Sequence, residues 1–158
     1  MAISPGMGDG AGEPRMEAAD ADGFIGVTYD DGRFNSIFRG IRARKESESV
    51  SRVRIETGFD RTNNADALHG GFMLAFLDHA IFMGPIAAGR LPMGGHSVTL
   101  GISTQFVAPG RPDMPLDCVV EIVSETGRLM FVRGQLEQGD RVVLTYQATL
   151  RKMSRPTG

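Results

Sequence analysis

Residues 69–80 read HGGFMLAFLDHA, and this stretch decides the predicted fold. It begins a longer segment, residues 70–88, that carries apolar side chains on nearly every face of a helix. A helix of this kind is expected in the interior of a protein rather than on its surface. Gly84 and Pro85 are expected to end or kink it, because proline lacks an amide proton and clashes with the preceding turn. The segment therefore predicts one long buried helix.

Asp78 is the exception within this helix, because its neighbours along the helix, such as Leu77 and Ile81, are apolar. An unpaired carboxylate in such surroundings is expected to be desolvated, which costs stability and makes the carboxylate a stronger base. We therefore predict that Asp78 has a chemical function. The alternatives are a partner arginine elsewhere in the chain, or a position that faces solvent beside His79.

Strands are predicted on both sides of the long helix. Before it we expect a short helix at 34–38 and strands at 41–45 and 50–57, because Val53 and Ile55 alternate with charged residues in the second strand. After it we expect four strands, at 98–107, 116–124, 129–136 and 141–151. Connections of hairpin length join the last three strands into a meander. This order predicts an α+β fold in which an antiparallel sheet packs around one helix.

Length and composition restrict the class of protein. A chain of 158 residues fits one domain, which we place at 23–158 after a disordered or loosely ordered tail at 1–22. The net charge of −2 points to neither nucleic acid nor an anionic membrane as a partner. Charged residues interrupt every apolar stretch before the roughly 18 residues that a membrane span needs. The single cysteine, Cys118, is expected in a strand core and suits a reducing cytoplasm.

Gly70 and Gly71 stand where the predicted helix begins. A helix N-terminus offers free amide protons and the positive end of the helix dipole, which together stabilise an oxyanion. Glycine lets a carbonyl group approach the backbone closely. The alternative is a tight turn in which packing alone requires glycine.

A family resemblance rests on four features in this order: Asn63, then His69-Gly70-Gly71, then Asp78 nine residues after the histidine, then the strand SVTLGISTQFVAPGRP at 97–112. The set resembles the signature of the hotdog-fold thioesterases, and most closely the phenylacetate-degradation (PaaI-type) acyl-CoA thioesterases. The resemblance extends over residues 34–152.

The resemblance implies a curved sheet around a central helix, and chains that pair into dimers and often into tetramers. It implies hydrolysis of an acyl-CoA thioester to a free acid and coenzyme A. By analogy, Asp78 is the nucleophile or the general base for water, and the Gly70 amide polarises the thioester carbonyl. Asn63 and Thr99 position the substrate or the water. The family often has glycine where Asp66 stands, which puts the conformation of this loop in question.

Helix geometry predicts how the site is assembled. Asp78 lies eight residues beyond Gly70, which is roughly 12 Å along one helix at 1.5 Å per residue. Reacting atoms must come within about 3–3.5 Å of one another. If both residues act on one carbonyl group, they must come from different chains. We therefore predict an obligate homodimer with two composite sites.

Further residues are candidates for substrate binding. His69 is expected to cap or shape the helix start, with a role as a base as the alternative, and Gly71 lies beside it. Phe72 is expected to line a pocket for an aryl or medium-chain acyl group, with packing in the core as the alternative. Arg111 and Arg128 suit the phosphates of coenzyme A, although solvated strand-end charges are the alternative. No metal or separate cofactor is expected, because no residues have metal-ligand spacing.

Other enzymes of the same fold require other residues. By resemblance, a β-hydroxyacyl dehydratase needs an acid where Met83 stands, and an enoyl-CoA hydratase needs a longer spacing than that between Asp66 and His69. Hydrolysis is therefore preferred. The remaining alternative is a non-catalytic acyl-CoA-binding or sensor protein, against which the presence of Asp78 argues.

Overall fold

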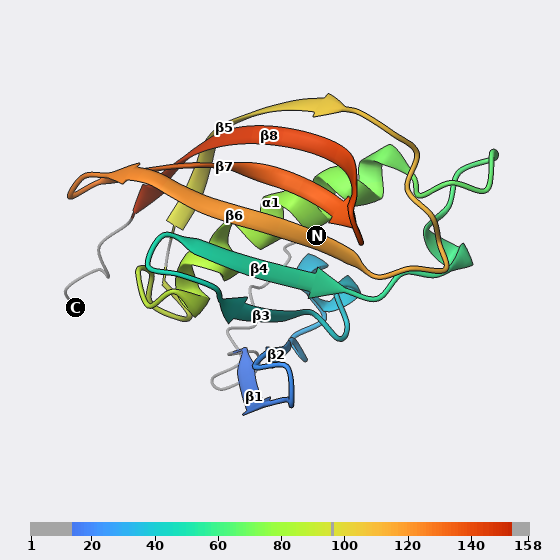
Figure 1. Ribbon diagram of the computed structural model, residues 1–158. Coiled ribbons are helices and arrows are strands. Elements are labelled where there is room, and N and C mark those ends of the chain that lie inside the picture. The colour runs from blue at the N-terminus through green and yellow to red at the C-terminus, as the bar shows by residue number, and fades with distance from the viewer. Residues whose placement is uncertain (1–13, 96, 153–158) are drawn as a thin grey trace, which may run out of the picture.

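The structure is a computed structural model that describes residues 14–95 and 97–152. Within these ranges one α-helix, two short 3-10 helices and eight strands follow one another along the chain (Figure 1). The elements are β1 (Arg15–Ala19), β2 (Ile25–Thr28), η1 (Phe34–Ile37), β3 (Arg42–Lys45), β4 (Val50–Ile55), η2 (Phe59–Arg61), α1 (Gly70–Ala87), β5 (Ser97–Phe106), β6 (Leu116–Glu125), β7 (Leu129–Gln138) and β8 (Arg141–Lys152).

The strands form a single antiparallel sheet in the order β1-β2-β3-β4-β6-β7-β8-β5. This sheet curves around α1, which crosses its inner face (Figure 1). The predicted meander is present as β6, β7 and β8, and β5 pairs with β8 at one edge of the sheet. The predicted α+β fold, an antiparallel sheet around a long central helix, is therefore confirmed.

Alternating side chains explain why the two faces of the sheet differ. Inward-facing residues such as Val53, Cys118 and Leu136 are fully buried against α1. The outer face carries charge pairs instead. Asp117 is only 6% exposed and accepts hydrogen bonds from Arg54 at 2.6 and 2.7 Å and from Arg52 at 3.0 Å.

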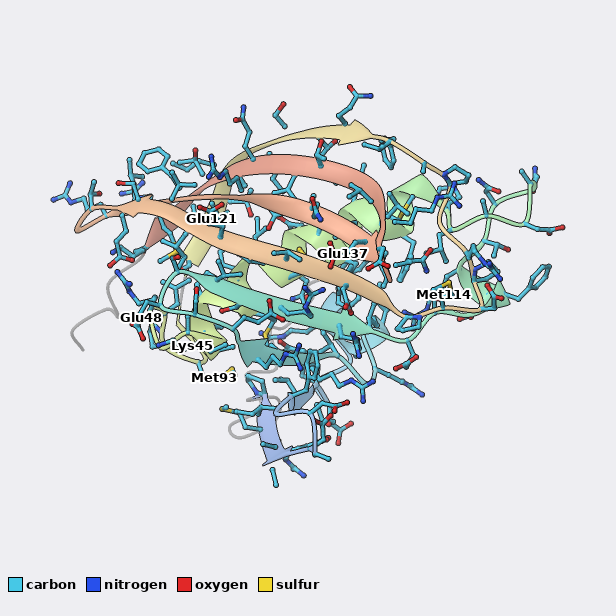
Figure 2. All side chains as sticks on the ribbon, in the orientation of Figure 1. Lys45, Glu48, Met93, Met114, Glu121 and Glu137 are labelled. Atoms are coloured by element: carbon cyan, nitrogen blue, oxygen red, sulfur yellow. The ribbon has the colours of Figure 1, made fainter. Side chains whose placement is uncertain are left out.

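Other charge pairs surround this cluster on the outer face and at the strand turns. Arg52 also bonds to Glu137 at 2.6 Å, and Glu121 accepts from Arg133 at 2.8 Å. Lys45 and Glu48 pair at 2.6 Å where β3 turns into β4 (Figure 2). The core therefore lies between the sheet and α1.

Gly84 and Pro85 do not end α1, which continues to Ala87 with Pro85 in its last turn, and a kink at these residues stays a prediction. There the ring removes one backbone hydrogen bond, and the carbonyl of Pro85 still accepts from the amide of Arg90 at 2.8 Å. Gly84 allows the helix to lie close to β6, since a Cβ at this position would be 2.8 Å from Cβ of Val120. This glycine therefore fixes how deeply the helix packs into the sheet.

The expectation that α1 is buried on all sides is wrong for the single chain. Its core face is buried through Met73, Phe76, Leu77, Ala80, Ile81, Met83, Gly84 and Pro85. Gly71, Leu74 and Asp78 are exposed on another face. By length and composition alone α1 could cross a membrane, contrary to the expectation that no segment could, but so could many core helices. One side of α1 is thus left for a partner or for solvent.

The N-terminal segment is only partly described. Residues 1–13 of the expected tail lie outside the described residues. Further on, β1 forms within the range that was expected to be loosely ordered, because Arg15 and Met16 pair with β2. All five residues of β1 are exposed. The boundary of the domain at residue 23 stays a prediction.

Candidate active site

His69 caps the N-terminus of α1. Its backbone is extended, and its Nδ1 accepts a hydrogen bond from the amide of Gly71 at 2.9 Å. A Cβ on Gly71 would lie 3.0 Å from this nitrogen, so glycine makes room for the ring. The cap satisfies one of the free amides at the helix start. This is the capping geometry expected of His69, and its contact with substrate stays a prediction.

The Gly70 amide is left free by this cap. Within residues 14–95 and 97–152 it has no hydrogen-bond acceptor. A Cβ on Gly70 would lie 3.3 Å from Cζ of Phe106, so this ring from the end of β5 flanks the amide. The helix start therefore presents an unused donor at the positive end of the helix dipole, as the stabilisation of an oxyanion requires.

Asn63 organises the loop that leads to the helix. Its Oδ1 accepts from the amides of Ala65 at 2.8 Å and Ala67 at 3.3 Å. Asp66 in the same loop has a φ of +55°, in the left-handed region that glycine adopts most easily. The loop thus keeps a glycine-like conformation although the chain has aspartate there. In this structure the Asn63 side-chain oxygen holds the loop, and its contact with substrate stays a prediction.

Asp78 lies in the middle of α1 and is exposed in the single chain. The expected burial of this carboxylate is therefore not found, and the alternative of a position that faces solvent is the one observed. Leu77 and Ile81 are buried in the core, while Asp78 lies on the open face with Leu74. Its Oδ1 accepts a hydrogen bond from Oγ1 of Thr99 on β5 at 2.7 Å. The structure thus joins two of the predicted catalytic residues through a charge-assisted hydrogen bond.

A cavity of about 450 Å³ adjoins Asp78 and runs between α1 and the η1 segment. His79 and three aromatic residues, Tyr29, Phe34 and Phe38, line it together with Asp78. This wall could not be predicted from sequence, because Tyr29, Phe34 and Phe38 lie 40 or more positions before Asp78. Only the path of the chain after β2 brings them to α1.

Phe72 lies in a different hollow, of about 440 Å³, beside the helix start. His69 lines the same hollow, and the Arg61 guanidinium stands over the Phe72 ring at 4.8 Å from its centre. Arg61 was not among the predicted site residues. An arginine before a helix carries no sequence signal of its own.

Arg111 and Arg128 are not brought together in one chain. Arg111 follows the end of β5 and is bonded to Asp113 at 2.6 and 3.0 Å. Arg128 lies in the β6–β7 turn, near the start of β5, where it lines a hollow with Leu100. The ten residues of β5 separate these two ends by roughly 30 Å. A shared phosphate site would therefore need two chains, and for each arginine phosphate binding stays a prediction.

The site residues thus form two half-sites. The first, at the helix start, consists of Asn63, His69, Gly70 and Gly71. The second, at the middle of the helix, consists of Asp78 and Thr99. Both half-sites lie on or against α1. Because Gly70 and Asp78 belong to the same helix, they are separated by roughly 12 Å along its axis, as expected. The described residues bring together no group of three or more His, Cys, Asp or Glu side chains placed to hold a metal ion.

Comparison with known proteins identifies the family. The family model described as "Thioesterase superfamily" matches residues 66–145, about half of the chain. No curated protein matches the sequence. Many solved structures share the fold.

Three of these structures illustrate the similarity. The E. coli PaaI protein from the phenylacetic acid degradation operon is 15% identical with a TM-score of 0.63, over 76% of this chain and 83% of that one. Zebra fish thioesterase superfamily member 2 is 13% identical with a TM-score of 0.66, over 78% and 89%. A Streptococcus pneumoniae hypothetical thioesterase, solved with coenzyme A, is 18% identical with a TM-score of 0.62, over 75% and 90%.

The chain therefore belongs to the thioesterase superfamily, and it is a thioester hydrolase with the hotdog fold. The resemblance drawn from Asn63, His69 to Gly71 and Asp78 is confirmed at the level of fold and family. The matched range 66–145 contains the whole of α1 and β5, and with them both half-sites except Asn63.

Proposed function

We propose that the chain hydrolyses an aryl- or medium-chain acyl-CoA to the free acid and coenzyme A, at composite sites formed by two subunits. The observation that carries this proposal is the arrangement of α1. Its free Gly70 amide and its Asp78 carboxylate both suit the reaction, yet they lie too far apart on one helix to meet at one carbonyl group.

The edge strand β5 supports a dimer. It is the last strand of the sheet and pairs only with β8 among the described strands. A ten-residue edge strand with exposed apolar side chains is a template for pairing with another chain. The exposed apolar residues on and just after β5 are Val98 (46%), Leu100 (56%), Phe106 (44%) and Val107 (56%). Antiparallel pairing of two β5 strands about a two-fold axis would cover this edge.

The same pairing would join the two half-sites. A two-fold axis between Ile102 and Ser103, close to the middle of β5, would set Thr99 opposite the partner's Phe106. Within one chain Thr99 is bonded to Asp78, and Phe106 flanks Gly70. Asp78 of one subunit would therefore face the Gly70 amide of the other, in both sites at once. The same pairing of the two β5 strands would also bring Arg128 of one subunit toward the partner's Arg111.

The proposed chemistry uses protein residues and water. As a general base, Asp78 takes a proton from water while the water oxygen attacks the thioester carbon, and the oxyanion forms at the partner's Gly70 amide. The carbon–sulfur bond then breaks, and the thiolate of coenzyme A takes up a proton. As a nucleophile, the carboxylate instead displaces the thiolate to form a mixed anhydride, which water cleaves. Either route needs Asp78 ionised, and coenzyme A enters only as part of the substrate.

Two further features bear on the assembly and its setting. A shallow hollow on the outer face of the sheet has Leu100, Val123 and Phe131 in its lining, and these exposed apolar residues support pairing of dimers into a tetramer. The buried free thiol of Cys118 suits the reducing cytoplasm, where we place the enzyme.

Release of free thiol from a panel of aryl and aliphatic acyl-CoAs tests the proposal. The wild type should release coenzyme A, and Asp78→Asn should release none although it remains a folded dimer by sedimentation. Asp22→Asn is the matched control, because it changes an exposed aspartate in the β1–β2 turn, at the opposite end of the sheet from β5, and should keep the activity. Bound acyl-CoA without release by the wild type would contradict the proposal and favour the binding protein.

A further inference from the structure

Four rings form a continuous row beside Asp78. Phe34 meets Phe38 edge to face, with ring centres 5.9 Å apart. Phe38 stacks on His79 at 5.0 Å with an angle of 13° between the planes. His79 in turn meets Tyr29 edge to face at 5.1 Å. We call Phe34, Phe38, His79 and Tyr29 the aromatic row. Its members come from three separate parts of the chain, and all four line the 450 Å³ cavity that adjoins Asp78.

The aromatic row is uncharged at neutral pH. Burial lowers the pKa of His79 to about 4, against the opposing effect of the Asp78 charge. Burial also raises the pKa of Tyr29 to about 12. His79 has a buried Nε2 with no hydrogen-bond partner among the described residues, so packing rather than polar contact holds the ring in the wall. An apolar group can therefore enter beside Asp78 without meeting a charge on the row.

Asp31 and Arg33 also line the cavity, so the aromatic row forms one wall of it rather than the whole lining. Against this wall the charged nucleotide of coenzyme A would lose hydration, whereas an acyl group would bury apolar surface. The volume is within the range of small-molecule sites, which is about 300–1,000 Å³. Since Asp78 borders the same space, a thioester carbonyl held at this carboxylate would direct its acyl group into the cavity.

We propose that the aromatic row forms the acyl-binding wall and that His79 is its specificity-determining residue, favouring a flat aromatic acyl group over an aliphatic chain of the same carbon number. This inference rests on the proposed acyl-CoA hydrolysis. His79 directly follows Asp78 on α1, so the helix that positions the carboxylate also positions this ring. Phe38 stacks on the imidazole and Tyr29 meets it edge to face, and these two contacts hold the plane of the ring in place.

The physical basis is ring geometry. An aromatic group gains from edge-to-face or offset contact with other rings beyond the area that it buries, and the gain corresponds to roughly 2- to 12-fold in an equilibrium or rate ratio. An aliphatic chain gains only from buried area. Replacing His79 by leucine removes the central ring and keeps an apolar side chain, so the aromatic preference should fall.

The experiment compares kcat/KM for phenylacetyl-CoA and octanoyl-CoA. Both acyl groups have eight carbons and a CH₂ beside the carbonyl, so the two thioesters have similar intrinsic reactivity. The wild type should prefer phenylacetyl-CoA. In His79→Leu the ratio of the two constants should fall roughly 2- to 12-fold, whereas His79→Phe should keep it. Phe34→Leu should also lower the ratio, and because Phe34 is 66% exposed this substitution leaves the buried core unchanged.

Phe131→Leu is the matched control, because Phe131 lies on the outer face of the sheet and lines a different hollow. Its ratio should equal that of the wild type. A wild-type preference for octanoyl-CoA would overturn the inference. Ratios in His79→Leu and Phe34→Leu equal to that of Phe131→Leu would do the same. Either result would still agree with the proposed hydrolysis of acyl-CoA. A wild type that hydrolyses neither compound would overturn the proposed function and this inference together.

Discussion

The Thr99 hydroxyl donates a 2.7 Å hydrogen bond to the Asp78 carboxylate and thereby links β5 to the middle of α1. Asp78 is exposed in the single chain, so neighbouring side chains do not confine it. A charge-assisted bond of this length gives the carboxylate a defined direction. Thr99 therefore acts as a positioning residue for Asp78 in the proposed mechanism.

Replacement of this hydroxyl should slow the reaction. Thr99→Val keeps the β-branched shape and removes the donor, and a hydrogen bond to a charged group contributes about 1.5–3 kcal/mol, so kcat should fall about tenfold or more. Thr99→Ser retains the donor and should keep most of the activity. Steady-state rates of thiol release from both variants measure the effect. A valine variant as fast as the wild type would show that Thr99 does not position Asp78.

The buried His79 should make stability depend on pH. Its pKa is lowered from 6.5 to about 4 in the folded chain, so the unfolded chain binds more protons between these values. The free energy of unfolding should therefore be fully retained above pH 6.5 and fall by up to about 3 kcal/mol as the pH drops toward 4. Urea unfolding of the wild type and of His79→Phe measures this contribution as the difference between the two pH profiles. Parallel profiles would contradict it.

The close contact between α1 and β6 should make Gly84 sensitive to substitution. In Gly84→Ala the new methyl group would stand 2.8 Å from Cβ of Val120, and relief of such overpacking costs about 1–3 kcal/mol. Gly127→Ala is the control, since no atom lies within 4 Å of its new methyl group. Urea titration should show a lower free energy of unfolding for Gly84→Ala alone. Equal stability of the two variants would mean that the helix can move away from the sheet at no cost.

The single thiol should be unreactive in the folded protein. Cys118 is fully buried, and burial raises its pKa to about 12, so almost no thiolate exists at neutral pH. A thiol reagent such as dithionitrobenzoate should therefore modify Cys118 only after denaturation. Fast modification of the native protein would show that the β6 region opens readily.

Much of the fold could be predicted because its signals are local. The apolar run from Gly70 to Ala87 predicts a helix that packs against the core, and alternation identifies β4 and the later strands. Pro85 shows where a local rule misleads, because a proline in the last turn disrupts one hydrogen bond and does not end the helix. Strands β1 and β2 are short and lie at the sheet edge, where little apolar pattern is required.

The site could be predicted only in part, for the same reason. His69, Gly70 and Asp78 share one helix, so their spacing alone gives their separation. Whether Asp78 is buried depends on which face meets the sheet, and apolar composition on every side conceals that face. Tyr29 and Phe38 reach His79 only through tertiary folding, so the cavity wall could not be read from the order of residues.

Subunit complementation tests the shared site most directly. Gly70→Pro removes the amide donor at the first helical position, where proline is tolerated, and Gly70→Ala is the control that keeps this donor. Asp78→Asn and Gly70→Pro homodimers should each be inactive, while Gly70→Ala should keep substantial activity. Each mixed dimer would hold one intact site, formed by Gly70 of one chain and Asp78 of the other.

The decisive measurement is thiol release after the two inactive variants are unfolded together and refolded in equal amounts. Random pairing makes half of the dimers mixed, each with one of two sites intact, so about one quarter of the wild-type activity should return. The two variants refolded separately and then combined without exchange should remain inactive. Mixed dimers that form and stay inactive would contradict the composite site.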